Sequence, residues 1–288
     1  MKEQKWQITK IPTFDVKNIF ECGQCFRWNK QEDGSYTGVF NGNVMNVQKN
    51  GNTVTFKGIC NGNIQEIVED YFDLKRDYEK IKEQLSQIDE HLKTSIQYGQ
   101  GIRILNQDLW EMIISYIISA NNNIPRIKGI IERLSKAYGK EIEWYGEKYY
   151  TFPTVEELKD VTVENYRKLG AGFRDIRLYE TVHMILDKKV DLEQMQNNPN
   201  TLEVREQLLS LSGVGPKVAD CILLFSTLKR FEVFPIDVWV RRVMNELYIK
   251  KQDETKVNKK DIEKLAHEKF GNLAGIAQQY LFYWKREA

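Results

Sequence analysis

The chain has 288 residues, which is enough for two domains of average size, and 41% of them are hydrophobic while 29% are charged. This composition is typical of a globular protein and excludes a disordered chain. The 42 basic and 41 acidic side chains give a net charge of only +1, which argues against a protein that binds nucleic acid through bulk positive charge.

The N-terminal residues and the most apolar stretch argue against export or membrane insertion. Residues 1–6 are not followed by an apolar segment of the kind that a secretory signal needs. The stretch 110–120 is interrupted by Glu111 and two serines and is too short to cross a bilayer. We therefore expect a cytoplasmic protein with no signal or transmembrane segment. Its four cysteines are then expected to be free thiols, although Cys22 and Cys25 have the spacing of a zinc or redox pair.

Residues 1–97 contain short β-rich runs separated by residues that favour turns. The separators are Asp33-Gly34, Asn41-Gly42-Asn43 and Lys49-Asn50-Gly51-Asn52, which are typical of hairpins. The β-rich runs cover residues 25–28, 36–40, 44–48 and 53–59. This pattern predicts a small antiparallel sheet, closed by one charged helix over about 79–97.

From residue 98 onward the hydrophobic pattern is helical. Asn106-Gln107-Asp108 can cap a helix whose apolar stripe contains Trp110 and a run of isoleucines. Further helices are predicted over residues 123–138, 154–161, 162–169, 174–187, 201–211, 217–228, 238–247, 259–270 and 272–284. The chain is therefore expected to divide into a β-rich domain over 1–97 and an all-helical domain over 98–288.

The most informative segment runs from Leu208 to Arg242. Gly213-Val214-Gly215 predicts a tight hairpin between two apolar helices, and Pro216 suits the first turn of the second helix. The two glycines let a ligand approach the backbone closely, and free N–H groups at the start of a helix can hold a phosphate. The pattern Leu-x-Gly-Val-Gly-x-Lys-x-Ala resembles the helix-hairpin-helix that grips a DNA backbone without reading its sequence. The predicted fold class is thus α+β, with a small N-terminal antiparallel β-sheet domain and a helical domain that contains a helix-hairpin-helix motif.

Lys217 begins the helix after the hairpin, and Asp237 follows twenty residues later. Each has an ordinary structural interpretation when taken alone, as a solvated lysine and as a helix N-cap. Together they resemble the helix-hairpin-helix DNA glycosylase superfamily, in which the lysine is the nucleophile and the aspartate is the essential acid beside it. A lysine needs a basic neighbour or a water-poor pocket to react at neutral pH, because its unperturbed pKa is about 10.4. We expect Asp237 mainly to stabilise the positive charge that develops as a glycosidic bond breaks.

Several short segments narrow this resemblance to the 8-oxoguanine DNA glycosylase family. They are Gly23-Gln24-Cys25-Phe26-Arg27-Trp28, Asn121-Asn122-Asn123-Ile124-Pro125-Arg126, Gly170-Ala171-Gly172-Phe173-Arg174, Val218-Ala219-Asp220-Cys221 and Ala277-Gln278-Gln279-Tyr280-Leu281-Phe282. They occur in the family's order and extend from about residue 22 to residue 282.

The resemblance implies a role for each candidate residue. The Gly23 carbonyl would accept a hydrogen bond from the ring N–H that oxidised guanine has and normal guanine lacks. Gln278 would bind the Watson–Crick edge of the flipped base, and Phe282 and Cys221 would contact its two faces. The residues that would contact the rest of the DNA are Asn121 in the gap of the duplex, Arg126, Phe173 and Arg174 at the opposite base, and Gly213 and Gly215 at the backbone. Each of these residues also has a structural interpretation, as a turn, a cap, a core aromatic or a surface ion pair.

The sequence departs from the family pattern at two positions. Phe173 stands where better-known members have a tyrosine, so the opposite-base preference is left open. Trp239 stands where they have a histidine that contacts a phosphate.

The implied function is that of a bifunctional DNA glycosylase/AP lyase, acting as a nucleoid-associated monomer on duplex DNA that contains 8-oxoguanine. No cofactor is expected in the chemistry, and carbonyls of the hairpin, such as those of Ser212 and Val214, could hold a structural monovalent cation. One alternative is another helix-hairpin-helix base glycosylase. The chain has no cysteine after Cys221, which argues against the iron–sulfur branch, and Lys217 argues against alkylbase glycosylases. A second alternative is a non-catalytic DNA-binding module.

Overall fold

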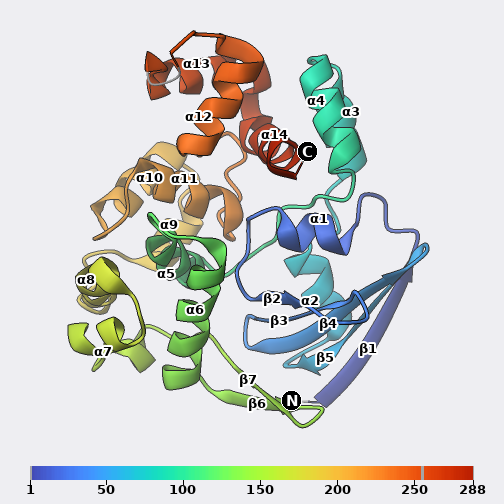
Figure 1. Ribbon diagram of the computed structural model, residues 1–288. Helices are drawn as coiled ribbons and strands as arrows, with labels where there is room; N and C mark the ends of the chain where they lie inside the picture. The colour runs from blue at the N-terminus through green and yellow to red at the C-terminus, as the bar shows by residue number, and fades with distance from the viewer. Residues whose placement is uncertain (1, 254–255, 288) are drawn as a thin grey trace.

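The N-terminal part of the protein is a five-stranded antiparallel sheet. The structure is a computed structural model and describes residues 2–253 and 256–287. The strands are β1 (Lys2–Thr9), β2 (Trp28–Lys30), β3 (Tyr36–Phe40), β4 (Asn43–Asn50) and β5 (Thr53–Cys60). They lie in the order β1-β5-β4-β3-β2 (Figure 1), which confirms the predicted sheet.

The edge strand β1 is not predicted from the sequence. Its side chains alternate between exposed and half-buried positions, and none of them is fully buried. The hydrophobic alternation that marks a half-buried strand is therefore weak in this segment. Its pairing with β5 extends over its whole length, from Lys2 opposite Cys60 to Thr9 opposite Thr53.

Two short helices, which the sequence analysis also does not predict, pack on the sheet. They are α1 (Val16–Glu21) and α2 (Ile64–Tyr71), and each begins at a side-chain cap, Asp15 and Asn63 respectively. An aromatic core fills the space between the helices and the sheet, and in it the rings of Phe20 and Trp28 stack with centroids 4.2 Å apart.

The prediction of one charged helix over 79–97 is wrong in one respect, because the structure has two helices there. They are α3 (Tyr78–Ser86) and α4 (Glu90–Tyr98), and Asp89 caps the second by accepting a hydrogen bond from the backbone N–H of Leu92. Their apolar side chains belong to the core of the helical part rather than to that of the sheet. In Figure 1, α4 lies beside the C-terminal helix α14. The domain boundary after residue 97 stays a prediction.

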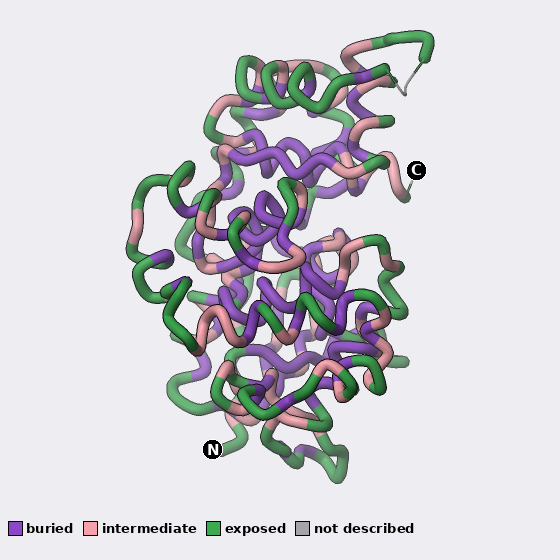
Figure 2. The backbone as a smooth tube through the Cα atoms, turned by 90° about the vertical axis from the view of Figure 1, so that its left-hand side faces the viewer, coloured by how far each residue is buried: buried purple, intermediate pink, exposed green. Residues whose placement is uncertain are grey.

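The rest of the chain is mainly helical, which confirms the predicted α+β class. The helices are α5 (Leu109–Ser119), α6 (Ile124–Tyr138), α7 (Val163–Lys168), α8 (Asp175–Leu186), α9 (Leu192–Asn197), α10 (Thr201–Ser210), α11 (Pro216–Phe225), α12 (Val238–Met244), α13 (Lys259–Phe270) and α14 (Ala274–Glu287), with 3₁₀ turns η1 (Glu156–Leu158), η2 (Gly172–Arg174) and η5 (Gly271–Leu273) and a π-helical segment η3 (Asn245–Ile249). Helix α5 is the centre of this part, since every residue from Leu109 to Ile118 is buried. Figure 2 shows the buried segments in the interior and the exposed ones around them.

A small β-hairpin interrupts the helical part, so this part is not all helical. Its strands are β6 (Glu141–Trp144) and β7 (Glu147–Tyr150), joined at Tyr145-Gly146. The hairpin lies close to β1 (Figure 1), where the hydroxyl of Tyr145 donates a 2.8 Å hydrogen bond to Glu3.

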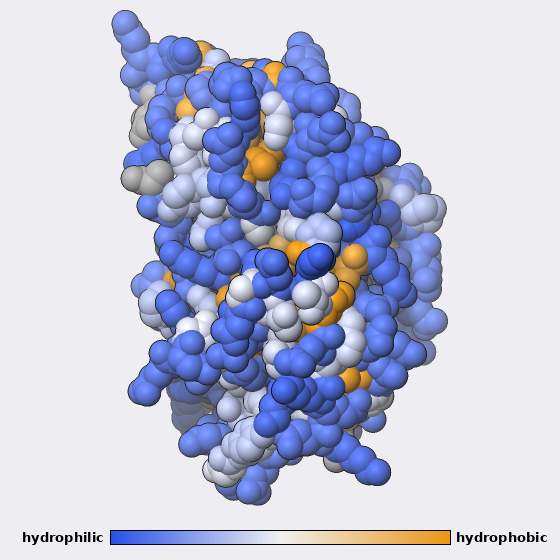
Figure 3. All heavy atoms as spheres, turned by 90° about the vertical axis from the view of Figure 1, so that its right-hand side faces the viewer, coloured by the Kyte–Doolittle hydropathy of each residue, from blue (hydrophilic) through white to orange (hydrophobic). Residues whose placement is uncertain are grey.

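The described residues include no helix that is long and apolar enough to cross a membrane. The face in Figure 3 is mainly hydrophilic, with only small apolar areas near its middle. All four cysteines are buried and unpaired, as predicted.

Candidate active site

The helix-hairpin-helix is formed by α10, the turn at residues 211–215 and α11. Gly213 has a φ of +84°, and a Cβ there would lie 3.0 Å from the side chain of Arg177. Gly215 precedes Pro216 at the start of α11, and a Cβ on it would have no neighbour within 4 Å. The side chain of Thr181 on α8 anchors the turn through a 2.8 Å hydrogen bond to the Ser212 carbonyl. The start of α11 is therefore open to a phosphate, whose charge the helix dipole favours.

Lys217 and Asp237 line the same small cavity. Asp237 caps α12, because its Oδ1 atom accepts a 2.7 Å hydrogen bond from the backbone N–H of Val240. Lys217 Nζ lies 5.4 Å from the ring centroid of Tyr116. Both side chains line the cavity together with Tyr116. Asp237 thus combines its predicted structural role with a position beside the lysine.

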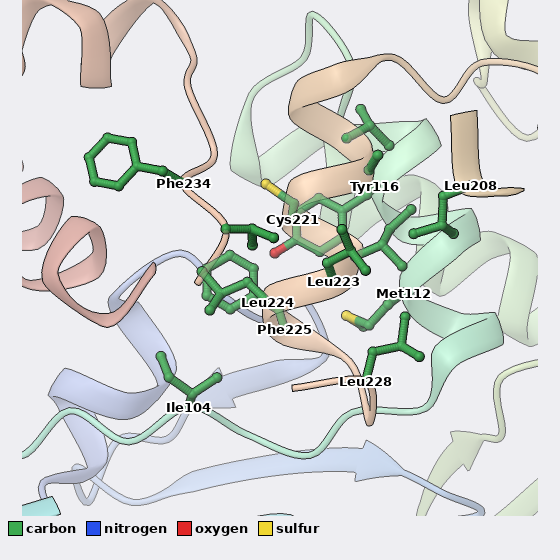
Figure 4. Packing of buried hydrophobic residues seen from close by; sticks show 14 of the residues in the cluster. Ile104, Met112, Tyr116, Leu208, Cys221, Leu223, Leu224, Phe225, Leu228 and Phe234 are labelled. Carbon is green, nitrogen blue, oxygen red and sulfur yellow. The ribbon is translucent and has the colours of Figure 1, made fainter. Parts of the chain in front are cut away.

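Cys221 forms an uncharged wall of this cavity. It follows Lys217 by one turn of α11 and packs beside Tyr116 of α5 (Figure 4). Burial raises the pKa of the Cys221 thiol to about 11, although the positive charge of Lys217 acts in the opposite direction. The thiol is therefore neutral at pH 7 and suits contact with the face of an uncharged ring.

The loop of Gly23 forms a second wall and is held by a buried glutamine. Gln24 Nε2 donates hydrogen bonds to the carbonyls of Ile19 (2.9 Å) and Arg103 (2.7 Å), and its Oε1 accepts one from the N–H of Leu105 (2.9 Å). Gly23 itself has a φ of +92°, and a Cβ there would lie 3.4 Å from Phe282. This loop is therefore fixed, and its backbone can approach a ligand because the residue has no side chain.

Helix α14 supplies the third wall through Gln278 and Phe282, which are one helical turn apart. Gln278 is only 5% exposed, and its Oε1 has no hydrogen-bond partner among the described residues. A buried acceptor without a partner is rare and needs an explanation. Gln278 lines the cavity, so this acceptor is in a position to meet a ligand there, and its predicted contact with a base stays a prediction.

Two further residues of α14 hold the walls of the cavity in place, and neither is predicted from the sequence. Gln279 Nε2 donates a hydrogen bond to the Cys22 carbonyl. The Arg286 guanidinium lies 5.3 Å from the ring centroid of Phe282 and donates to the Glu21 carbonyl. Arg286 lies one helical turn beyond Phe282, and that spacing was the one signal in the sequence that pointed to it.

Six of the predicted residues therefore surround one cavity of about 60 Å³. Its described lining consists of Gly23, Tyr116, Lys217, Cys221, Phe225, Pro235, Asp237, Val240, Gln278, Gln279 and Phe282. The cavity opens into a groove of about 730 Å³ that also contains Asn121, Trp239 and Arg286.

The predicted opposite-base residues lie outside this cavity, after the end of α5, at the start of α6 and in η2. Arg174 is only 1% exposed, and its donors are occupied by the backbone carbonyls of Asn121 (2.7 Å), Ala120 (2.8 Å) and Ala171 (3.1 Å). Arg174 therefore holds the loop that carries Asn121, whose φ is +49°. A direct contact of Arg174 with a base stays a prediction.

Phe173 and Arg126 are the accessible members of this group. Phe173 is 54% exposed, and its ring centroid lies 4.3 Å from the Arg174 guanidinium and 5.3 Å from that of Arg177. Arg126 is also exposed, and its Nη2 donates a long 3.5 Å hydrogen bond to the Gly170 carbonyl. These two side chains form a protruding edge with aromatic and cationic character.

Comparison with known families agrees with this geometry. Residues 7–113 match the family model of the 8-oxoguanine DNA glycosylase N-terminal domain, and residues 114–270 match that of the HhH-GPD superfamily base excision DNA repair proteins. The chain belongs to the HhH-GPD superfamily. A probable N-glycosylase/DNA lyase of Methanothermobacter thermautotrophicus is 33% identical over 245 residues, which are 78% of this chain and 76% of the relative.

Two solved structures are similar to this superfamily member over nearly its whole length. The Clostridium acetobutylicum 8-oxoguanine glycosylase/lyase, in complex with double-stranded DNA that has cytosine opposite 8-oxoguanine, is 44% identical. It covers 99% of this chain and 97% of its own, with a TM-score of 0.93. MBOgg1 in complex with a low-affinity DNA ligand is also 44% identical, with a TM-score of 0.92 and coverage of 100% and 99%.

Proposed function

We propose that the protein is a bifunctional DNA glycosylase/AP lyase that excises 8-oxoguanine from duplex DNA in base excision repair. The observation that carries this proposal is the cavity in which Lys217, Asp237 and the unpartnered Gln278 meet. The 44% identity to an 8-oxoguanine glycosylase/lyase supports the choice of base.

Recognition begins when the damaged nucleotide leaves the helix, at a cost of a few kcal/mol. The base enters between Cys221 and Phe282, with its ring N–H toward the Gly23 carbonyl and its Watson–Crick edge toward Gln278. Normal guanine presents a lone pair instead of the N–H, which leaves a buried acceptor unpaired at a cost of about 1–3 kcal/mol. The cavity of about 60 Å³ is too small for a purine, so the base has to displace the half-buried Phe282.

The chemistry begins when the neutral amine of Lys217 attacks the anomeric carbon of the sugar. A C–N bond forms to Lys217 Nζ, and the glycosidic bond breaks with its electron pair going to the base, which takes up a proton. The Asp237 carboxylate stabilises the positive charge on the sugar. Opening of the sugar ring gives a Schiff base, after which loss of a 2′ proton expels the 3′ phosphate and nicks the strand.

Replacement of the nucleophile tests this proposal. Lys217→Gln is expected to reduce excision from a duplex containing 8-oxoguanine by several orders of magnitude, because the reaction loses its nucleophile. Borohydride should trap a covalent DNA adduct with the unaltered protein and none with the variant. The control is Lys264→Gln, which removes an exposed lysine of α13.

The alternative of a non-catalytic DNA-binding module predicts a different result. A module would give no trapped adduct with the unaltered protein, and Lys217→Gln would only weaken its DNA binding slightly. Another helix-hairpin-helix base glycosylase would excise a different lesion. Duplexes with 8-oxoguanine opposite each of the four bases distinguish these cases and measure the opposite-base preference.

Three further parts of the proposal concern the state of the protein. It acts as a monomer in the cytoplasm, associated with the nucleoid. A monovalent cation fits the hairpin, since backbone carbonyls are suitable ligands and the Ser212 carbonyl, which accepts one hydrogen bond from Thr181, has a second lone pair. The Ser212 and Val214 carbonyls would hold such an ion and bring positive charge to the phosphate site. DNA affinity that does not change when potassium or sodium is replaced by a bulky organic cation would contradict the cation site.

A further inference from the structure

A second hollow, separate from the base cavity, adjoins the groove of the proposed active site. It has a volume of about 660 Å³ and is formed by α12, η3 and the end of α14. Its described lining consists of Trp239, Arg242, Val243, Asn245, Glu246, Trp284 and Lys285. Trp239 and Arg242 also line the groove that contains Lys217, so the two hollows form one continuous surface.

Two tryptophans give this hollow its chemical character. Trp239 is 39% exposed, which is a large apolar area to leave in water, and Trp284 is partly exposed. Lys285 Nζ lies 4.8 Å from the ring centroid of Trp284 and forms an ion pair with Glu246 at 2.5 Å. This ion pair neutralises the charge of Lys285. Besides Arg242, the lining then consists mainly of the two rings and uncharged groups, which suit a flat or apolar group.

The position of Trp239 indicates which group would lie on it. Trp239 follows Asp237 by two residues at the start of α12, so it is adjacent to the carboxylate that faces the reacting sugar. Trp239 lines both the groove that contains Lys217 and the second hollow, and Trp284 lines the second hollow alone. A strand that continued from the base cavity into this hollow would therefore pass Trp239 and then Trp284.

We propose that this hollow, the tryptophan groove, binds the lesion-containing strand beside the flipped nucleotide through contacts of its bases or sugars with Trp239 and Trp284. The inference rests on the proposed function, because the occupant is the DNA that the active site acts on. Aromatic stacking is tolerant of base sequence and adds affinity without releasing counterions. Such a surface also suits a chain with a net charge of +1, which has little excess charge for binding phosphates.

Salt-dependent binding measurements test the tryptophan groove. Trp239→Ala and Trp284→Ala are each expected to weaken binding of an 8-oxoguanine duplex about tenfold. The slope of log affinity against log salt should stay unchanged, because no phosphate contact is removed. Phenylalanine at either position should restore most of the affinity. The control is Tyr145→Ala, which removes a more exposed aromatic ring (66%, against 39% for Trp239) on the distant β6–β7 hairpin and should leave the affinity unchanged.

Two results would overturn this inference. The first is unchanged affinity in both alanine variants with thermal unfolding like that of the unaltered protein. The second is a loss of affinity with a salt slope smaller by about one, which indicates a lost phosphate contact. Borohydride trapping by the unaltered protein separates the two proposals. If the unaltered protein is trapped on DNA but neither tryptophan variant binds more weakly, only the tryptophan groove is rejected. If the tryptophan variants bind more weakly but the unaltered protein is not trapped, the glycosylase function is rejected and the DNA-binding groove remains.

Discussion

The base cavity and the opposite-base edge of this protein are stabilised in different ways. The cavity walls come from the Gly23 loop, α11, the start of α12 and α14, and buried hydrogen bonds of Gln24 and Gln279 fix the loop against its neighbours. At the other edge, the exposed Phe173 ring lies against the guanidinium groups of Arg174 and Arg177, and Arg174 is the buried member of the group. The backbone of the Gly23 loop is therefore fixed before DNA arrives and Phe282 is the wall that moves, whereas the opposite-base edge completes its contacts on the DNA.

Arg174 is the exception at that edge, and its removal gives the largest expected effect on stability. Arg174→Ala leaves the carbonyls of Ala120 and Asn121 without their side-chain donor, while the Ala171 carbonyl keeps the backbone N–H of residue 174, so we expect a loss of about 2–4 kcal/mol in the free energy of unfolding. Urea unfolding measures this loss. Arg177→Ala, at an exposed arginine beside the same aromatic ring, should change stability by less than about 0.5 kcal/mol. If Arg174→Ala instead kept full stability and altered the choice of opposite base, Arg174 would belong to the DNA-reading side chains.

Gly23→Ala tests whether the Gly23 loop is a fixed wall that lies against the bound base. The new Cβ would lie 3.4 Å from Phe282 and 3.2 Å from Arg286, and it would have to adopt a φ of +92°. We expect 8-oxoguanine excision to fall about tenfold, since each 1.4 kcal/mol lost from the transition state costs that factor. Nicking of a preformed abasic site should fall much less, because no base occupies the cavity.

A matched glycine separates crowding from backbone strain in that experiment. Gly34 has a similar φ of +80°, but a Cβ on it would have no neighbour within 4 Å. Gly34→Ala should therefore cost similar stability and leave excision unchanged. Equal losses of excision in both variants would show that strain, rather than contact with the base, explains the Gly23 result.

The sequence predicts the cavity better than it predicts the opposite-base edge, for a physical reason. Glycine turns, helix caps and apolar periodicity are local signals, and they place the hairpin and the helix starts that carry Lys217 and Asp237, whereas the roles of these two residues come from the family resemblance. The position of Arg174 depends on how closely the end of α5 approaches η2, and no local pattern contains that distance.

The same limit explains the missed elements of the fold. The break between α3 and α4 at Asp89 is difficult to predict because the charged helical pattern continues on both sides of it. The edge strand β1 has no fully buried residue, so it lacks the alternation of a core strand. Gln279 and Arg286 act through contacts with the carbonyls of Cys22 and Glu21, more than 250 positions away along the chain.

Arg286 contacts both the chain just before the Gly23 loop and Phe282 of α14. Its replacement is expected to have a smaller effect on excision than Gly23→Ala. Arg286→Leu removes the hydrogen bond to the Glu21 carbonyl and the cation that covers the Phe282 ring. We expect kcat/KM for 8-oxoguanine excision to fall by roughly threefold to tenfold, about 0.7–1.4 kcal/mol, because Phe282 is less well oriented. Arg286→Lys keeps the charge and should recover only part of the loss. Full recovery with lysine, together with a salt slope restored by about one, would instead indicate a phosphate contact.

The smallest expected effect on stability and the most selective effect on function come from Phe173. Because the ring is 54% exposed, Phe173→Ala should change the free energy of unfolding by less than about 0.5 kcal/mol. The variant should instead change the ratio of the excision rate opposite cytosine to the excision rate opposite adenine. We expect a change of a few-fold, or about 1 kcal/mol. Phe173→Tyr adds a hydroxyl that can contact a base or phosphate and should change the same ratio in the opposite direction. An unchanged ratio in both variants would mean that the choice of opposite base depends on Arg126 and on the loop that Arg174 holds. The contrast between a loop fixed before DNA binds and an edge completed by the DNA would then fail at Phe173.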